Sequence, residues 1–223
     1  FGSMMLANGE AEALISGITR KYQDMLRPAL QIIGMKKEVK RVAGMYMMLT
    51  KKGPIFFADA SVNFNPTEDE LVDITVLAAK EVENFNIKPR IAMLSYSNFG
   101  SSDSAEAILV RNAVAKLKAN HPELIVDGEM QASVAFNQEL MKENYPFSAL
   151  VNEPPNVFIF PNLSAGNIAY NLLQEIGGAE AIGPILLGLN KPVHVLQLGS
   201  TVRQIVNMVA ISVVEAQLKS AKK

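Results

Sequence analysis

Two polar loops, each between a predicted strand and a predicted helix, carry residue types that bind anions. The six candidate ligand-binding residues in these loops are Ser95, Ser97, Asn98, Asn162, Ser164 and Asn167. Hydroxyl and amide groups, together with the free backbone N–H groups of a helix start, can hold a phosphate or carboxylate. Ligands tend to bind at the carboxyl ends of parallel strands. The sequence therefore predicts that a ligand site involves these loops.

Each loop also has a structural interpretation. The serine-rich loop, residues 95–102, is either an anion site or a loop whose hydroxyls cap the following helix. In the second loop, Asn162 or Ser164 is the predicted helix N-cap. Gly166 lets another group approach the first helical turn closely. That group is a phosphate, a pantetheine-like amide or a neighbouring strand.

Arg27 is a further candidate, because it directly precedes Pro28. An Arg-Pro pair predicts an extended or turn geometry just before a helix. A guanidinium placed there can hold a phosphate with two parallel hydrogen bonds. The alternative is a surface ion pair.

Other patterns give no support to several enzyme classes. The sequence has no Gly-x-Ser-x-Gly, no Walker motif and no Gly-x-Gly-x-x-Gly after a strand, and it has no cysteine. Asp59, Asp127 and Glu129 lie at strand ends, where cap and turn roles are expected. His194 lies inside an apolar strand and is expected to be a core residue. A hydrolase, a kinase and a dinucleotide dehydrogenase therefore have no support, and we predict no metal site in this chain.

The composition is that of a folded protein with a large core. The chain has 223 residues, 49% of them hydrophobic, and a formal net charge of -1. This balance argues against nucleic acid or a membrane as the main partner. Because the chain opens on Phe1 in an apolar segment with no signal peptide, we expect a fragment of a longer cytoplasmic protein.

Short apolar segments alternate with longer segments of helical period, which favours an α/β fold with a largely parallel sheet. The predicted strands are residues 13–18, 42–49, 55–60, 90–95, 124–127, 157–160, 185–187 and 193–196. The predicted helices are residues 23–33, 67–85, 104–120, 131–143, 164–176 and 201–219. Segments 42–49 and 55–60 are close enough to predict an antiparallel hairpin. Thr67 and Glu70 predict a capping box at the start of the second helix.

The last predicted helix has no charged residue between Gln204 and Val214. Its apolar side chains lie around most of its circumference, so it is expected to be enclosed. The enclosing surface is the core of the domain or, as the alternative, a partner chain.

Six segments resemble the phosphate acetyltransferase family, in order and over nearly the whole chain. They are LRPALQIIG, FFADASVNFNPTEDEL, PRIAMLSYSNFGSS, PELIVDGEMQ, FPNLSAGNIAYNLLQ and IGPILLGLNKPVHVLQLGSTVRQIVNMVAI. The last segment is closer still to the C-terminal domain of large bacterial NADP-dependent malic enzymes. The resemblance implies an isocitrate/isopropylmalate dehydrogenase-like α/β fold with two subdomains. Residues 37–188 would form a subdomain inserted into the other, of which residues 1–36 and 189–223 are the remaining part.

The sequence departs from the family where acetyl transfer takes place. The resemblance places a Ser, an Arg and an Asp at positions where this chain has Gln197, Leu198 and Gln204. The family's arginine before proline is kept as Arg27, but the threonine two residues earlier is Met25. Transfer of acetyl to phosphate needs cations on the phosphoryl oxygens and a base for the thiol. The matching positions supply neither.

The resemblance therefore implies a regulatory domain of a malic enzyme that converts malate to pyruvate elsewhere in its chain. Acetyl-CoA is the expected allosteric effector, and the catalytic half of the same chain and a second copy, as in a dimer, are the expected partners. No cofactor is expected in this domain, and NADP and a divalent metal are implied only for the catalytic half. The alternatives are an active phosphate acyltransferase and a purely structural dimerisation module.

Overall fold

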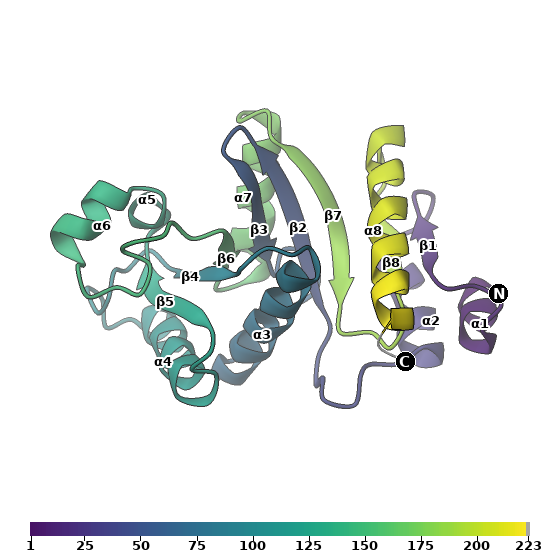
Figure 1. Cartoon of the computed structure of the whole chain (residues 1–223), viewed down its shortest axis with the longest axis horizontal. Coiled ribbons are helices and arrows are strands. Elements are labelled where there is room, and N and C mark those ends of the chain that lie inside the picture. Colours follow the sequence, from purple (N-terminus) through teal and green to yellow (C-terminus); the bar gives the residue numbers. More distant parts are fainter. Residues whose placement is uncertain (222–223) are drawn as a thin grey trace.

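A computed structural model describes residues 1–221, which include all but the last two residues of segment 189–223. Its larger sheet has six strands in the order β5-β4-β6-β3-β2-β7 (Figure 1). These strands are β2 (Ala43–Thr50), β3 (Gly53–Ala58), β4 (Arg90–Leu94), β5 (Ile125–Met130), β6 (Val157–Ile159) and β7 (Glu180–Leu187). β3, β6, β4 and β5 run parallel, whereas β2 is antiparallel to both β3 and β7. The mixed α/β class and the hairpin are confirmed.

Helices cover both faces of this sheet. One face packs on α3 (Glu68–Asn84) and α4 (Ala105–Asn120), and the other on α5 (Ala132–Ala135), α6 (Gln138–Asn144) and α7 (Leu163–Glu175). The strand pleat separates the two cores, because successive side chains point to opposite faces. Phe56 thus joins the α3–α4 core, while Phe57 joins the α5–α7 core.

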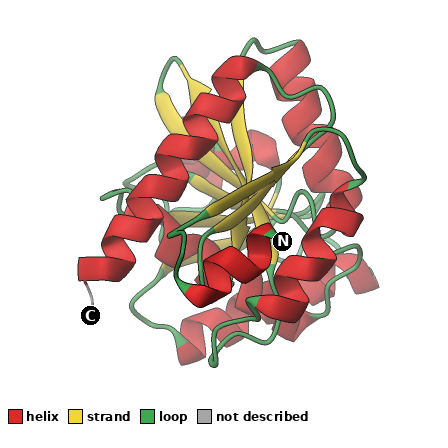
Figure 2. Ribbon diagram, turned by 90° about the vertical axis from the view of Figure 1, so that its right-hand side faces the viewer, coloured by secondary structure: helices red, strands yellow, loops and turns green. Residues whose placement is uncertain are grey.

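A second, two-stranded parallel sheet pairs β1 (Leu14–Gly17) with β8 (Val193–Leu196). It is accompanied by α1 (Gly2–Asn8), α2 (Tyr22–Ile32) and α8 (Val202–Ala221), the long helix that crosses the view in Figure 2. The chain passes between the sheets twice, at residues 33–42 and 188–192. The two crossings are joined by a hydrogen bond from Lys36 N–H to the Gly188 carbonyl, 3.0 Å.

Helix starts follow the polar residues that precede them. Thr67 and Glu70 form the predicted capping box at α3, with both hydrogen bonds present. Thr201 and Gln204 form a second one at α8. There the Thr201 N–H donates to Gln204 Oε1 at 2.8 Å, and the Gln204 N–H donates to Thr201 Oγ1 at 3.2 Å. Gln204 therefore has a structural role at the start of the last helix.

Three predicted elements differ from the structure. One is the strand predicted at residues 185–187, which is β7 and begins five residues earlier, at Glu180. The single helix expected over residues 131–143 is divided into α5 and α6, because the Asn137 side chain accepts from the Leu140 N–H and begins a new helix. Strand β5 continues through Glu129, beyond the predicted end at Asp127.

The prediction that the core encloses α8 is wrong for one face of the helix. Val206, Val209 and Val213 are 59%, 46% and 48% exposed, whereas Met208 and Ile211 are buried. The sheets cover only one side of α8, so half of its apolar circumference faces outward. Within residues 1–221, no helix is both long enough and apolar enough to span a membrane.

Candidate functional site

The start of α7 lies at the centre of the candidate site. Asn162 is the N-cap, and its Oδ1 accepts from the Ala165 N–H at 2.9 Å. Ser164 is exposed on the first turn. Asn167 is half-buried, and its Nδ2 donates to the Ala60 carbonyl at 3.4 Å. The α7 start thus joins the loop that follows β3.

Gly166 is close to a neighbouring strand end. A Cβ at this position would lie 2.5 Å from the backbone oxygen of Asp59 and 3.3 Å from the Ala60 Cα. Of the three groups considered from the sequence, the structure therefore places protein backbone against Gly166.

We expect Gly166→Ala to lower the free energy of unfolding by about 1–3 kcal/mol, the usual cost of forcing an extra methyl into a packed contact. Urea denaturation followed by circular dichroism measures this change. Glu175→Ala, exposed on the same helix, serves as the control and is expected to change stability by less than about 0.5 kcal/mol. Equal stability of the Gly166→Ala variant and the unaltered protein would contradict the close contact.

A cavity of about 510 Å³ brings the two predicted loops together. It lies beyond the carboxyl ends of β4 and β6, and both Ser95 and Asn162 line it. Apolar side chains including Leu94, Leu109 and Phe160 also line it, as do polar groups such as Tyr96. The cavity can accept a ligand with a large apolar part and a few hydrogen-bonding groups.

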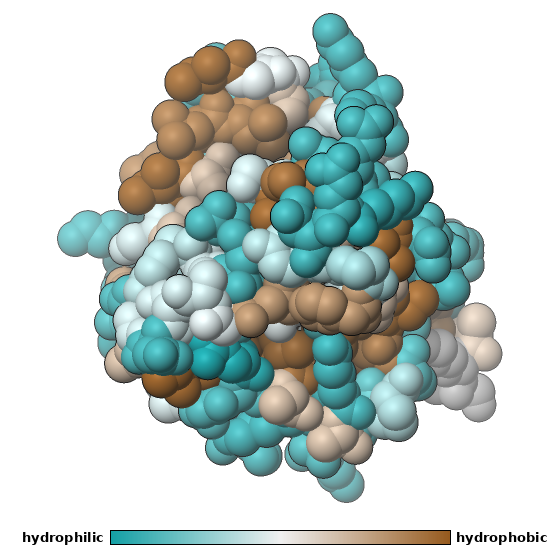
Figure 3. Space-filling view, turned by 90° about the vertical axis from the view of Figure 1, so that its left-hand side faces the viewer, coloured by the Kyte–Doolittle hydropathy of each residue, from teal (hydrophilic) through white to brown (hydrophobic). Residues whose placement is uncertain are grey.

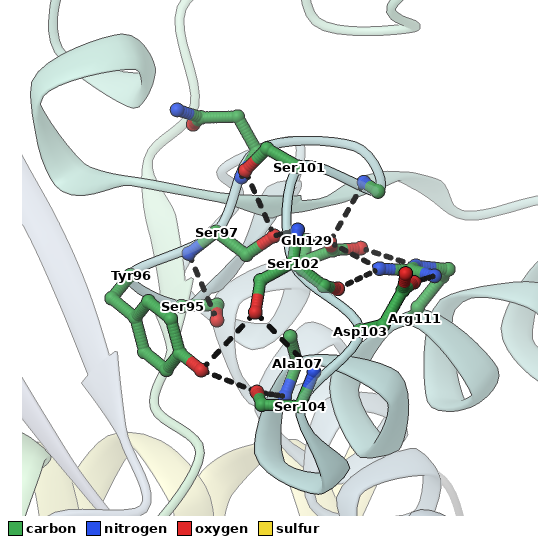
Figure 4. Close-up of polar contacts among 12 residues, drawn as sticks. Ser95, Tyr96, Ser97, Ser101, Ser102, Asp103, Ser104, Ala107, Arg111 and Glu129 are labelled. Carbon is green, nitrogen blue, oxygen red and sulfur yellow. Dashed lines mark hydrogen bonds and ion pairs between the residues drawn. The ribbon is translucent and has the colours of Figure 1, made fainter.

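The serine-rich loop holds a carboxylate of the same chain (Figure 4). Glu129 Oε1 accepts from Ser97 Oγ at 2.8 Å and from the Gly100 N–H at 2.9 Å. Arg111 donates to both carboxylate oxygens at 3.2 Å. Burial opposes ionisation of Glu129, but these donors lower its pKa below the usual value.

A further side chain of this loop also bonds within the protein. Asn98 Oδ1 accepts from the Gln131 N–H at 2.8 Å, which ties the loop to the end of β5. Ser97 is buried, whereas Ser95 is half-buried at the cavity. The loop therefore fixes the cavity wall, and Ser95 is its predicted ligand residue that reaches the cavity.

A second cluster lies on the other side of α7, between the two sheets. The rings of Tyr46 and Tyr170 are stacked with centroids 4.0 Å apart, and the Tyr170 hydroxyl donates to Gln197 Oε1 at 3.3 Å. Buried hydroxyls of Tyr22, Tyr46 and Ser61 have no hydrogen-bond partner within residues 1–221. Burial raises the pKa of Tyr22 and of Tyr46, so both phenols are neutral. Sequence patterns did not point to these tyrosines, because nothing in their spacing differs from that of core residues.

Asp59 holds the backbone of the loop between these two regions. Its carboxylate accepts from the N–H groups of Ser61, Val62 and Asn63 at 2.8–3.0 Å. Burial raises its pKa, while these donors act in the opposite direction. Asp59 therefore has the turn role expected from the sequence and is directed into its own loop.

The positions that depart from the family lie after β8. Gln197 is half-buried and contacts Tyr170, whereas the Leu198 side chain is 68% exposed. Neither side chain is ionisable, and Gln204 belongs to the α8 capping box. In the region that the structure describes, no three metal-binding side chains lie together.

Arg27 lies inside a helix, so the predicted extended geometry before a helix start is wrong. α2 begins at Tyr22, five residues earlier, and Pro28 is within it. Pro28 has no N–H to donate to the carbonyl of Asp24, and the exposed position of Asp24 lets water take that place. Arg27 is exposed, and its side chain forms no hydrogen bond or ion pair with residues 1–221.

The fold and the sequence define the class of this protein. The family model described as "Phosphate acetyl/butaryl transferase" matches residues 1–213, and the chain belongs to this family. It is 42% identical over 215 residues to the NADP-dependent malic enzyme of Haemophilus influenzae, covering 96% of this chain and 28% of that protein. It is 40% identical over 216 residues to the phosphate acetyltransferase of Bacillus subtilis, covering 97% of this chain and 67% of that protein.

A solved structure agrees with these matches. The phosphotransacetylase from Streptococcus pyogenes superposes with a TM-score of 0.91 at 39% identity, over 97% of this chain and 66% of that one. The chain thus spans just over a quarter of the malic enzyme and about two thirds of the two transferases.

Proposed function

We propose that the chain is the phosphate acetyltransferase-like regulatory domain of an NADP-dependent malic enzyme, and that it binds acetyl-CoA without transferring the acetyl group. The observation that carries this proposal is the end of β8. Gln197 and Leu198 stand there in place of the serine and arginine expected from the family, and neither can act as a base or a cation. The parent protein would convert malate to pyruvate in another domain, with NADP and a divalent metal bound there.

The surroundings of these residues support binding without turnover. The neutral amide of Gln197 accepts a hydrogen bond from Tyr170. The Gln204 side chain accepts one from the Thr201 N–H. A thiol entering here meets no group that removes its proton, and a phosphate meets no guanidinium at Leu198. Loss of one charged transition-state contact commonly costs orders of magnitude in rate.

The ligand site that we propose extends along the start of α7. The 510 Å³ cavity offers apolar area for the long organic part of acetyl-CoA, with Ser95 and Asn162 at its polar wall. Ser164 and Asn167 continue along the helix start, toward Gln197. Ser97 and Asn98 act on this site indirectly, since their side chains hold Glu129 and Gln131. Arg27, exposed and unpaired within residues 1–221, is the proposed phosphate contact.

We further propose the isocitrate/isopropylmalate dehydrogenase-like arrangement with residues 37–188 inserted between 1–36 and 189–223. In its support, the six-stranded sheet uses strands from residues 43–187 only, and the chain crosses to the second sheet twice. The 510 Å³ cavity lies within residues 37–188, but the Tyr170–Gln197 hydrogen bond joins the two proposed subdomains, so movement between them would change the site at Gln197. Such movement could transmit acetyl-CoA binding, provided that the ligand prefers one arrangement.

Isothermal titration calorimetry with acetyl-CoA tests the binding proposal. We expect saturable binding, and Arg27→Ala is expected to weaken it about tenfold, since a charge-assisted hydrogen bond contributes about 1.5–3 kcal/mol. Arg20→Ala, exposed just before α2, is the charge-matched control and should bind normally. Absence of heat at millimolar acetyl-CoA would reject the proposal, and normal affinity of Arg27→Ala would assign that residue a structural role.

The alternative of an active acyltransferase is tested separately. Release of free CoA thiol from acetyl-CoA with phosphate would show turnover by the unaltered protein. A rate no higher than that of buffer, together with saturable binding, supports the regulatory function.

A homo-oligomer is the second part of the proposal. A groove of about 1140 Å³ runs along the sheet between α7 and the α5–α6 segment. Ile168 and Leu172 of α7 and its C-cap Ile176 are exposed beside it. Figure 3 shows broad apolar areas on the side of the molecule that carries α5 and α6. Apolar areas of this kind favour association. Sedimentation velocity distinguishes a dimer from a monomer, and a monomer at high concentration would remove oligomerisation from the proposal.

A further inference from the structure

Two acidic side chains from different helices meet where the two sheets join. Glu81 lies on α3, which packs on the six-stranded sheet, and Glu215 lies on α8, which packs on β1, β7 and β8. Glu81 is buried, and it lines a cavity of about 230 Å³ together with Glu215. Its Oε2 accepts from Asn84 Nδ2 at 3.1 Å, but its Oε1 has no donor within residues 1–221. A proton on one carboxyl group would supply the missing donor between the two acids.

The surrounding groups decide which acid carries the proton. His194 on β8 accepts the Leu186 N–H through Nδ1 at 3.2 Å, so the hydrogen of the neutral ring is on Nε2. Nε2 lies 3.4 Å from Glu215 Oε2, but it forms no hydrogen bond within residues 1–221. Glu81 is the acid that keeps its proton, because its burial disfavours the charged form.

Three lysines and Glu38 complete the environment of the pair. Lys36, Lys191 and Lys219 line a cavity of about 230 Å³ together with Glu81 and Glu215. Lys219 Nζ donates to the Asn190 carbonyl at 2.9 Å, and Lys191 Nζ donates to the carbonyls of Leu6 and Ala7. In the described part of the chain, none of these lysines forms an ion pair with Glu81 or Glu215. The lysines reduce the local negative potential, yet they do not replace the missing donor.

We propose that Glu81 and Glu215 share one proton across this contact, and that loss of the proton weakens the packing of α8 against α3. The proton leaves Glu81 for solvent through the lysine-lined cavity, and two adjacent carboxylates then face each other without a donor. Because α8 begins at Val202, shortly after Gln197 and Leu198 of the proposed site, the contact is a proton-sensitive connection between the two sheets. This inference does not depend on which ligand the site binds.

The direction of the pH effect follows from the pKa of each group. Burial, followed by the charge of Glu215, raises the pKa of Glu81 from 4.5 to about 8. The folded protein then holds a proton that the unfolded chain releases near pH 4.5, so folding loses stability as pH rises from about 4.5 to 8. Burial lowers the pKa of Lys219 from 10.5 to about 8, which acts in the opposite direction above pH 8. The range from pH 5.5 to 7.5 therefore avoids Lys219. Histidines also titrate in this range, so the contribution of Glu81 is obtained by comparing a Glu81 variant with the unaltered protein.

The test compares Glu81→Gln with the unaltered protein in this window. The glutamine amide supplies a permanent donor, so the variant should lose the pH dependence that belongs to Glu81. Release of one proton changes the unfolding equilibrium constant about tenfold per pH unit. We therefore expect the ratio of the unfolding constant of the unaltered protein to that of Glu81→Gln to change about tenfold per pH unit. Glu83→Gln, exposed two residues away on α3, is the matched control and should keep the unaltered profile.

Hydrogen exchange provides a readout that a purely local effect would not change. After correction for intrinsic exchange rates, amides in the second half of α8 should lose protection with rising pH in the unaltered protein and keep it in Glu81→Gln. Glu215→Gln provides a second variant with the same expectation if Glu81→Gln folds poorly. A constant stability ratio from pH 5.5 to 7.5, or equal loss of α8 protection in both proteins, would overturn the proposal.

Discussion

Replacement of Phe158 by alanine is expected to lower the free energy of unfolding by about 3–5 kcal/mol. Phe158 lies on β6, between β3 and β4, and its side chain is 0% exposed. Its ring packs edge-on against Phe57, with centroids 5.7 Å apart, and stacks on Phe136 at 4.5 Å. Removal of the ring leaves a cavity that strands on both sides cannot fill.

The effect of this substitution should extend to the ligand site. β6 leads directly into Pro161 and Asn162, so a displaced strand moves the N-cap of α7. Phe64→Ala removes a ring that is 64% exposed and provides the matched control, with an expected change below about 0.5 kcal/mol. Denaturation by urea measures both variants. A loss below 1 kcal/mol for Phe158→Ala would show that this core is loosely packed.

Local sequence signals predicted most of the helices and strands. Thr67 and Glu70 fix the start of α3 through hydrogen bonds between neighbours in the sequence, and such signals do not depend on the rest of the fold. Predictions were wrong where a tertiary contact determines the boundary or the burial of an element. Asn137 divides one expected helix while Phe136 stacks on Phe158 of a distant strand. The apolar circumference of α8 indicated burial, but only one side of the helix meets the sheets.

The candidate site shows the same division. Asn162 could be recognised as a helix cap from its position after a strand. The carboxylate that the serine-rich loop binds could not be recognised from the sequence. Glu129 is about 30 residues away and reaches Ser97 only through pairing of β5 with β4. The Glu81–Glu215 contact joins residues even further apart, from helices that no motif relates. Such contacts follow from topology, and residue types alone do not reveal them.

Restoring the family's residues after β8 is the second prediction with a large effect. If the chain transfers no acetyl group, as we propose, and these three positions alone account for it, the triple variant Gln197→Ser, Leu198→Arg, Gln204→Asp should release CoA thiol from acetyl-CoA and phosphate. We expect a rate at least about 100-fold above that of the unaltered protein, equivalent to about 2.7 kcal/mol of transition-state stabilisation. An aspartate at position 204 remains favourable in the first turn of α8, so folding should not suffer.

A matched variant separates the geometry of the cation from its charge. Lysine in place of arginine at position 198 keeps the positive charge but lacks the planar fork that holds two phosphoryl oxygens. The lysine version of the triple variant should therefore be slower, while both versions bind acetyl-CoA. If the arginine version binds acetyl-CoA and still shows only the background rate, the loss of transfer lies outside these three positions. In that case the exposed Leu198 would not account for the proposed lack of turnover.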